Sequence, residues 1–184
     1  MNLKKLKIIS VIGIFLIAFP IHFMYTRFPN SIFSIFFPVN ESIWEHMKML
    51  FSSFIIWSFI EYILLQNFKL LYHNFIFSSF FSAFISIPIF LILYLPFHYT
   101  IGHNIIITLI IMFITISIVE YISYKILKSK ECKYLNYISL ILIVISYIIF
   151  GYLTYKPIRN DLFYDYEDNK YGVNIYILGN QKKI

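Results

Sequence analysis

The sequence predicts an all-α membrane protein: a bundle of about five transmembrane helices with a short interfacial or re-entrant segment and a small polar C-terminal tail. Two observations on composition indicate this class. Hydrophobic residues make up 60% of the 184 residues and charged residues 13%, whereas soluble domains contain about 45–50% and 25%, and the mean hydropathy is +0.76. The third observation is that apolar stretches of about 20 residues recur along the chain, which is the length of a helix that crosses a bilayer.

Five stretches are long and apolar enough to cross the bilayer, and together they form one transmembrane domain over residues 1–157. The first follows a basic start, as a signal peptide would. Its apolar run is longer than the roughly 7–15 residues of a signal sequence and no small-residue cleavage site follows, so we expect an uncleaved span. Pro88 is expected to kink the third span, and Pro157 to end the fifth. The expected spans are residues 8–26, 42–66, 73–96, 102–128 and 134–155.

Two segments lie outside these spans. Residues 27–39 are rich in Phe and contain Pro29 and Pro38, and they are too short to cross a bilayer, so we expect an interfacial or re-entrant piece. The tail, residues 158–184, is polar. Within it, residues 162–166 and 171–178 flank a polar turn, which predicts a small β-hairpin.

The lysines of the short loops predict the orientation. They precede the first span and follow the second and fourth, which puts them all on one side of the membrane. The positive-inside rule makes that side cytoplasmic. We therefore expect a bacterial cytoplasmic-membrane protein with its N-terminus inside and its tail outside. The single cysteine, Cys132, excludes an internal disulfide, and no interleaved basic and aromatic face indicates a nucleic-acid partner.

The second span begins inside a motif that gathers polar and ionisable side chains, residues 38–48. Ser42 and Glu45 form a capping box, and Asn40 is an alternative cap. On a helix that included them, Glu41 and Glu45 would share a face. His46 would lie about 140° from Glu41, so those two side chains alone are poorly placed to chelate one ion.

The same motif carries a family resemblance. Asn40-Glu-Ser-Ile-Trp-Glu-His-Met-Lys48 resembles the signature N-E-S-[IV]-W-E-H-[LM]-K of an uncharacterised bacterial family of small multi-spanning membrane proteins, domain-of-unknown-function family 6512. Weaker resemblances follow in the same order along the chain, at residues 21–25, 60–62, 123–127 and 170–173. The resemblance implies a multi-pass membrane protein and no particular activity.

The predicted topology brings four histidines and two carboxylates to the outer face. We therefore predict an outward-facing polar cavity that binds or processes a small ligand, an ion or a lipid head group. A divalent metal held by Glu41, Glu45, His46 and His22 is one form of such a site, because facing helices of a bundle bind metals with these side chains. The candidate cluster is His22, Asn40, Glu41, Trp44, Glu45, His46, His98 and His103.

Other interpretations remain open. The glutamates of the motif can simply cap a helix, Trp44 can belong to an aromatic belt, and His98 and His103 can be loop residues. A cap needs only Ser42 and Glu45, however, which leaves Asn40, Glu41 and His46 without a role. Two further functions compete: a membrane-embedded metal-dependent hydrolase or transferase, and an accessory subunit that docks on a membrane-protein partner or on a second copy. No sequence motif of a known reaction class is present.

Two more carboxylates, Glu61 and Glu120, lie within spans, near their cytoplasmic ends. A charge at mid-bilayer costs about 2.5–3.5 kcal/mol on insertion scales. We expect them to stay protonated, to pair with a lysine such as Lys125, or to hydrogen-bond a tyrosine. Structural pairing is favoured over a proton or ion path.

Overall fold

The computed structural model describes residues 2–70 and 72–173. It confirms the all-α class, because five of its helices are long and apolar enough to cross a membrane. The protein is therefore a multi-pass membrane protein, and its apolar outer faces suit a lipid bilayer. The elements are α1 (Leu3–Arg27), α2 (Ser31–Phe36), α3 (Ile43–Asn67), α4 (Phe75–Ile101), α5 (Ile105–Leu127), α6 (Lys133–Tyr155), β1 (Tyr164–Asp165) and β2 (Lys170–Tyr171).

Side-chain caps set the starts of three long helices. Asn2, Ser42 and Asn104 each accept a hydrogen bond from a backbone N–H of the first turn of α1, α3 and α5, which satisfies donors that have no partner within the helix. The cap at Asn2 starts α1 five residues before the expected span. Lys7 is consequently inside the helix and buried, instead of preceding the membrane.

Helix α4 continues past the expected end at residue 96. Pro88 and Pro96 both lie inside it, which membrane helices tolerate because neighbouring groups satisfy the freed carbonyls. The helix ends at Gly102, whose φ of +80° lies in the left-handed region that favours glycine.

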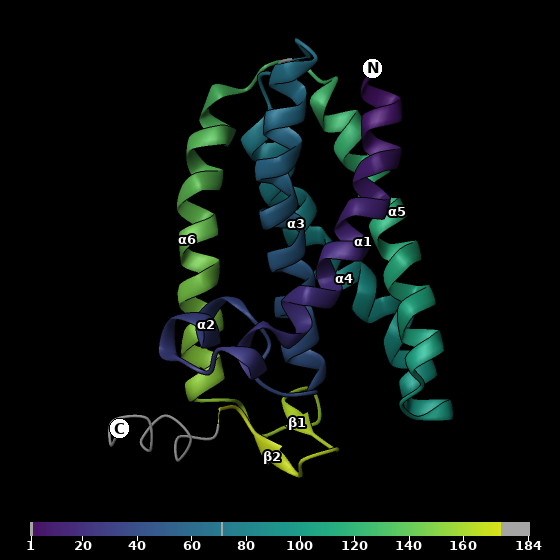
Figure 1. Ribbon diagram of the computed structural model, residues 1–184, viewed down its shortest axis with the longest axis vertical. Helices are drawn as coiled ribbons and strands as arrows, with labels where there is room; N and C mark the ends of the chain where they lie inside the picture. The colour runs from purple at the N-terminus through teal and green to yellow at the C-terminus, as the bar shows by residue number, and fades with distance from the viewer. Residues whose placement is uncertain (1, 71, 174–184) are drawn as a thin grey trace.

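The long helices pack as a bundle in which α1 contacts α3 and α5, and α4 contacts α3, α5 and α6 (Figure 1). The core lies where these helices meet and includes the fully buried Phe51 and Ile116. Helix α6 is the most peripheral and exposes most of its apolar side chains. We refer below to the two ends of the bundle as the N-terminal end and the hairpin end.

The hairpin end is built from α2, the motif and residues 158–173 of the tail (Figure 1). Helix α2 falls within the segment expected to be too short to cross, and it packs against α6. The two short strands pair antiparallel, with Tyr164 opposite Tyr171 and Asp165 opposite Lys170. The second strand was expected to reach residue 178, and residues 174–178 lie outside the described part of the chain. Asp165 is fully buried, so the hairpin packs as part of the fold.

Candidate functional site

The first residues of the motif precede α3, and the rest belong to the helix. Because Ser42 is the N-cap, Glu41 lies in the non-helical segment before the helix, while Glu45 lies in its first turn. The backbone N–H of Glu41 donates to Asp165 Oδ2 at 3.2 Å. The prediction that Glu41 and Glu45 share a helix face is therefore wrong, and the two carboxylates enter different surroundings.

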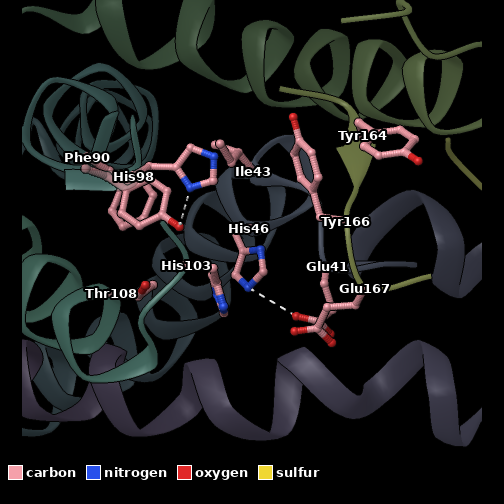
Figure 2. A pocket seen from close by; sticks show the side chains of 11 residues that line it. Glu41, Ile43, His46, Phe90, His98, His103, Thr108, Tyr164, Tyr166 and Glu167 are labelled. Atoms are coloured by element: carbon pink, nitrogen blue, oxygen red, sulfur yellow. Dashed lines mark hydrogen bonds and ion pairs between the residues drawn. The ribbon is translucent and has the colours of Figure 1, made fainter. Parts of the chain in front are cut away.

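Glu41 contacts two histidines from different helices. Its Oε2 atom lies 3.2 Å from Nε2 of His22 on α1 and 3.5 Å from Nε2 of His46 on α3 (Figure 2 shows the second pair). One ligand atom from each of the three residues can be chosen so that all lie within 4.8 Å of one another. All three side chains are only partly exposed. Two imidazoles and a carboxylate at this spacing are a donor set typical of zinc and iron sites.

One hydrogen bond fixes the tautomer of His46. Its Nδ1 atom lies 3.0 Å from the carbonyl oxygen of Ser42, which only accepts, so Nδ1 carries the hydrogen. In the neutral ring Nε2 then has a lone pair, and this lone pair faces the Glu41 carboxylate. Two acceptors at that distance need a cation between them, either a proton or a metal ion.

Glu41 is available as an anion. The hydrogen bond from His22 holds the pKa of the Glu41 carboxyl below its ordinary value, against the opposing effect of its partial burial, and the positive charges of nearby imidazoles act in the same direction as the bond. An ionised carboxylate is the form that ligates a metal.

A cavity of about 120 Å³ adjoins the cluster (Figure 2). Glu41 and His46 form one part of its wall, and the rest comes from α4, α5, the loop between them and the hairpin. His98 and His103, expected at this level, both line the cavity, and the Tyr94 hydroxyl lies 3.4 Å from Nδ1 of His98. The remaining lining residues are Ile43, Phe90, Thr108, Tyr164, Tyr166 and Glu167.

Glu45 lies outside this cluster, contrary to the expectation of a metal ligand. Its Oε2 atom is 2.5 Å from Nζ of Lys48, and its Oε1 accepts from the Thr154 hydroxyl at 3.0 Å. Lys48 also donates to Thr154 and to the carbonyl of Ser34, both at 2.8 Å. The network is buried and joins α2, α3 and α6, so its evident role is structural.

Asn40 and Trp44 hold residues 162–172 of the tail against the motif. Asn40 donates to the Gly172 carbonyl at 3.1 Å, and the Trp44 ring stacks on Phe163 with centroids 4.7 Å apart. The Trp44 backbone N–H donates to the Leu162 carbonyl at 2.8 Å. Neither Asn40 nor Trp44 lines the cavity, although sequence reasoning grouped both with the site.

Several residues of the site were missed from the sequence. Asp165, Tyr166 and Glu167 belong to a tail that was expected as a separate polar segment, and Tyr94 was one of many tyrosines. A usable signal existed for Asp165, because a polar tail with a short strand pattern and several aromatic residues can pack on a neighbouring surface.

Glu61 and Glu120 pair with a lysine that was not predicted. Both carboxylates reach Lys7 of α1, at 2.6 and 3.1 Å. Lys125, named from the sequence as one example of a lysine partner, lies instead over the ring of Tyr121, 5.3 Å from its centroid. The early start of α1 brings Lys7 into the bundle and explains the difference.

Comparisons with known proteins give one match. The model of a family described as "Family of unknown function (DUF6512)" matches residues 1–173. Searches of curated proteins and of solved structures found no match.

Proposed function

The chain belongs to this family of unknown function, so its own residues have to indicate its activity, and we propose that it binds a divalent transition-metal ion, zinc foremost, at the hairpin end. His22, Glu41 and His46 are the proposed ligands. The single observation that carries the proposal is the position of Glu41 Oε2, 3.2 and 3.5 Å from two imidazole nitrogens on separate helices.

These spacings suit one tetrahedral ion. Zinc bonds of about 2.0–2.1 Å to N and O ligands separate neighbouring ligand atoms by roughly 3.3 Å. Both distances from Glu41 fall near that value, and the three ligand atoms all lie within 4.8 Å of one another. The proposed ligands also come from three segments, α1, α3 and the loop before α3, so a bound ion would join the first two spans.

Three protein ligands leave a fourth position free, as in catalytic zinc sites. The cavity of about 120 Å³ is lined by Glu41 and His46, two of the three proposed ligands, and it has room for only a small polar ligand or a substrate group. We propose that such a ligand binds there on the metal, with His98, His103 and Tyr166 around it.

A second candidate function is metal-dependent hydrolysis, which one observation favours. Glu167 and His103 line the same cavity as Glu41 and His46, two of the three proposed ligands, and either side chain is a suitable general base for a water on the metal. A transferase would need the same groups and a second substrate.

The lysine distribution supports a location for the site. Lysines gather in the basic start and in the loop around Lys130, both at the N-terminal end, and the positive-inside rule makes that end cytoplasmic. The proposed metal site then faces outward from a bacterial cytoplasmic membrane. Docking of the apolar helix faces on a partner or a second copy stays a prediction of the sequence.

Metal analysis of the purified full chain tests the proposal. After metal removal and titration with zinc, we expect about one equivalent to bind tightly to the wild type, and no tight binding to His22→Ala, Glu41→Gln or His46→Ala. His73→Ala is the matched control, because His73 is exposed at the other end of the bundle. Wild-type binding that survives all three site substitutions, or no tight binding by the wild type, would overturn the proposal.

The hydrolase candidate has a separate test. We expect the zinc-loaded wild type to cleave an activated ester, and Glu167→Gln or His103→Ala to lose this activity while keeping the metal. Zinc binding without cleavage would leave metal binding standing and discard hydrolysis of esters.

A further inference from the structure

A second cluster of charges lies near the N-terminal end of the bundle, away from the proposed metal ligands His22, Glu41 and His46. The Lys7 ammonium lies 2.6 Å from Glu61 of α3 and 3.1 Å from Glu120 of α5, and it donates to the Ser123 hydroxyl at 2.6 Å. Lys7, Glu61 and Glu120 are only 6%, 4% and 3% exposed. The cluster therefore joins α1, α3 and α5 inside the bundle.

The cluster holds one positive group and two carboxyl groups. Among the described residues that line the small cavity beside it, Lys7, Glu61 and Glu120 are the only charged ones, and α4 contributes hydroxyl groups, among them Ser78 and Ser82. If both carboxyl groups were ionised, a net negative charge would be buried within membrane-spanning helices, which is strongly unfavourable. One additional positive charge neutralises the site.

The dimensions of the small cavity favour a proton as that charge. The cavity has a volume of about 10 Å³, which is roughly the space of a single water. The Lys7 ammonium already takes the position between the carboxylates that a metal cation would need. The Ser82 hydroxyl lines this cavity, is buried and has no hydrogen-bond partner among the described residues, so a water there would gain a partner.

A wider cleft connects the cluster with the surface. It lies between α1 and α5, has a volume of about 330 Å³, and is lined by both Lys7 and Glu120. Glu61 does not line it. The titratable groups that face the cluster or the cleft from the packed helices are Lys4 and Lys7 of α1, Glu61 of α3, and Glu120, Tyr121 and Tyr124 of α5.

We propose that Lys7, Glu61 and Glu120 form a proton-binding site that exchanges its proton with the solution at the N-terminal end through this cleft. A proton from water or hydronium in the cleft forms an O–H bond on a carboxylate oxygen, and the reverse step returns it. Glu120 carries the proton, because it is farther from the ammonium than Glu61 and lines the cleft. The site is independent of the metal site at the hairpin end.

Infrared spectroscopy of the full chain in lipid nanodiscs tests this proposal. At neutral pH we expect the wild type to show the carbonyl band of one protonated carboxylic acid, shifted in D₂O because the proton exchanges. Glu61→Gln and Glu120→Gln should each lose the band, because the remaining carboxylate pairs with Lys7 one to one. Lys7→Met should show two protonated acids instead of one. Glu131→Gln is the matched control, an exposed carboxyl in a loop at the same end, and should keep the band.

Three outcomes would overturn the proposal. The first is a wild type without the band at neutral pH. The second is a band that persists in both glutamine variants, which would assign the protonated acid to another residue. The third is a band that appears only when choline replaces sodium, because sodium would then be the neutralising cation. Lys7→Met is not needed for these decisions, so its failure to fold leaves the test intact.

Discussion

The carboxylate of Glu45 lies 2.5 Å from the ammonium of Lys48, about one helical turn away on α3, and both side chains are sealed from solvent. Thr154 of α6 hydrogen-bonds to both of them. Burying two charges is costly, and the attraction between them offsets that cost only while both are present.

The first prediction concerns this pair. Lys48→Met or Glu45→Gln should each lower the free energy of unfolding by about 3–5 kcal/mol, because one buried charge loses its partner. The double variant should lose less than the sum of the two single changes. Unfolding in detergent, followed by tryptophan fluorescence, measures all four proteins. Strictly additive losses would mean that the pair does not act as a unit.

The second prediction separates the two glutamates of the motif. Glu45→Gln should weaken the fold and leave the zinc stoichiometry of the folded fraction unchanged, whereas Glu41→Gln should abolish tight zinc binding with a smaller loss of stability. The reason is that only Glu41 contacts His22 and His46. Zinc titration alongside thermal unfolding checks both variants, and loss of zinc from folded Glu45→Gln protein would contradict the division.

The third prediction concerns acid. In the metal-free protein the hydrogen bond from His22 lowers the pKa of Glu41 below its ordinary value of 4.5. Glu41 therefore adds stability that is fully present above that ordinary value and is lost as the pH falls through its lower folded-state pKa. The stability advantage of wild type over Glu41→Gln should shrink as the pH is lowered below 4.5. Thermal unfolding of both proteins with a chelator present measures it, and an advantage that does not change with pH would refute the prediction.

The fourth prediction concerns the hairpin. Asp165 is fully buried and accepts hydrogen bonds from the backbone N–H groups of Glu41, Glu167 and Asp168. Asp165→Ala should cost about 1–3 kcal/mol, because these donors lose their partner, and it should weaken zinc binding by releasing Glu41. Limited proteolysis of the tail and zinc titration report the two effects. Asp168→Asn is the control, because that side chain is exposed, and equal effects of the two changes would contradict a specific role for Asp165.

Hydropathy alone predicts the spans well, because a bilayer requires long apolar helices whatever the details of packing. Successive spans run in opposite directions, which likewise predicts that His22, near the end of the first span, and the motif, at the start of the second, lie at the same end of the bundle. The burial of the Glu45–Lys48 pair was not predictable, since Thr154 and Ser34 complete the network from distant segments. Glu41 was expected on the helix, but α3 begins one or two residues later than that expectation requires. A difference of this size is the usual uncertainty of helix boundaries.

Lys7 shows a different failure of sequence reasoning. A lysine in a basic N-terminal segment is normally an anchor at the membrane surface. Lys7 is buried because the cap at Asn2 starts the helix before it and because carboxylates of two later helices pair with its ammonium group. The need of Glu61 and Glu120 for a cation was visible in the sequence, but the identity of that cation was not.

The hydrogen bond that Asp165 accepts from the Glu41 backbone N–H has a consequence for biogenesis. The segment that positions Glu41 is synthesised 124 residues after it, so ribosomes finish all five long helices before the hairpin can dock. Nascent chains stopped after α6 would carry every proposed metal ligand, yet their loop before α3 would lack the hydrogen bond from Glu41 to Asp165. Maturation of the site is thus tied to completion of translation.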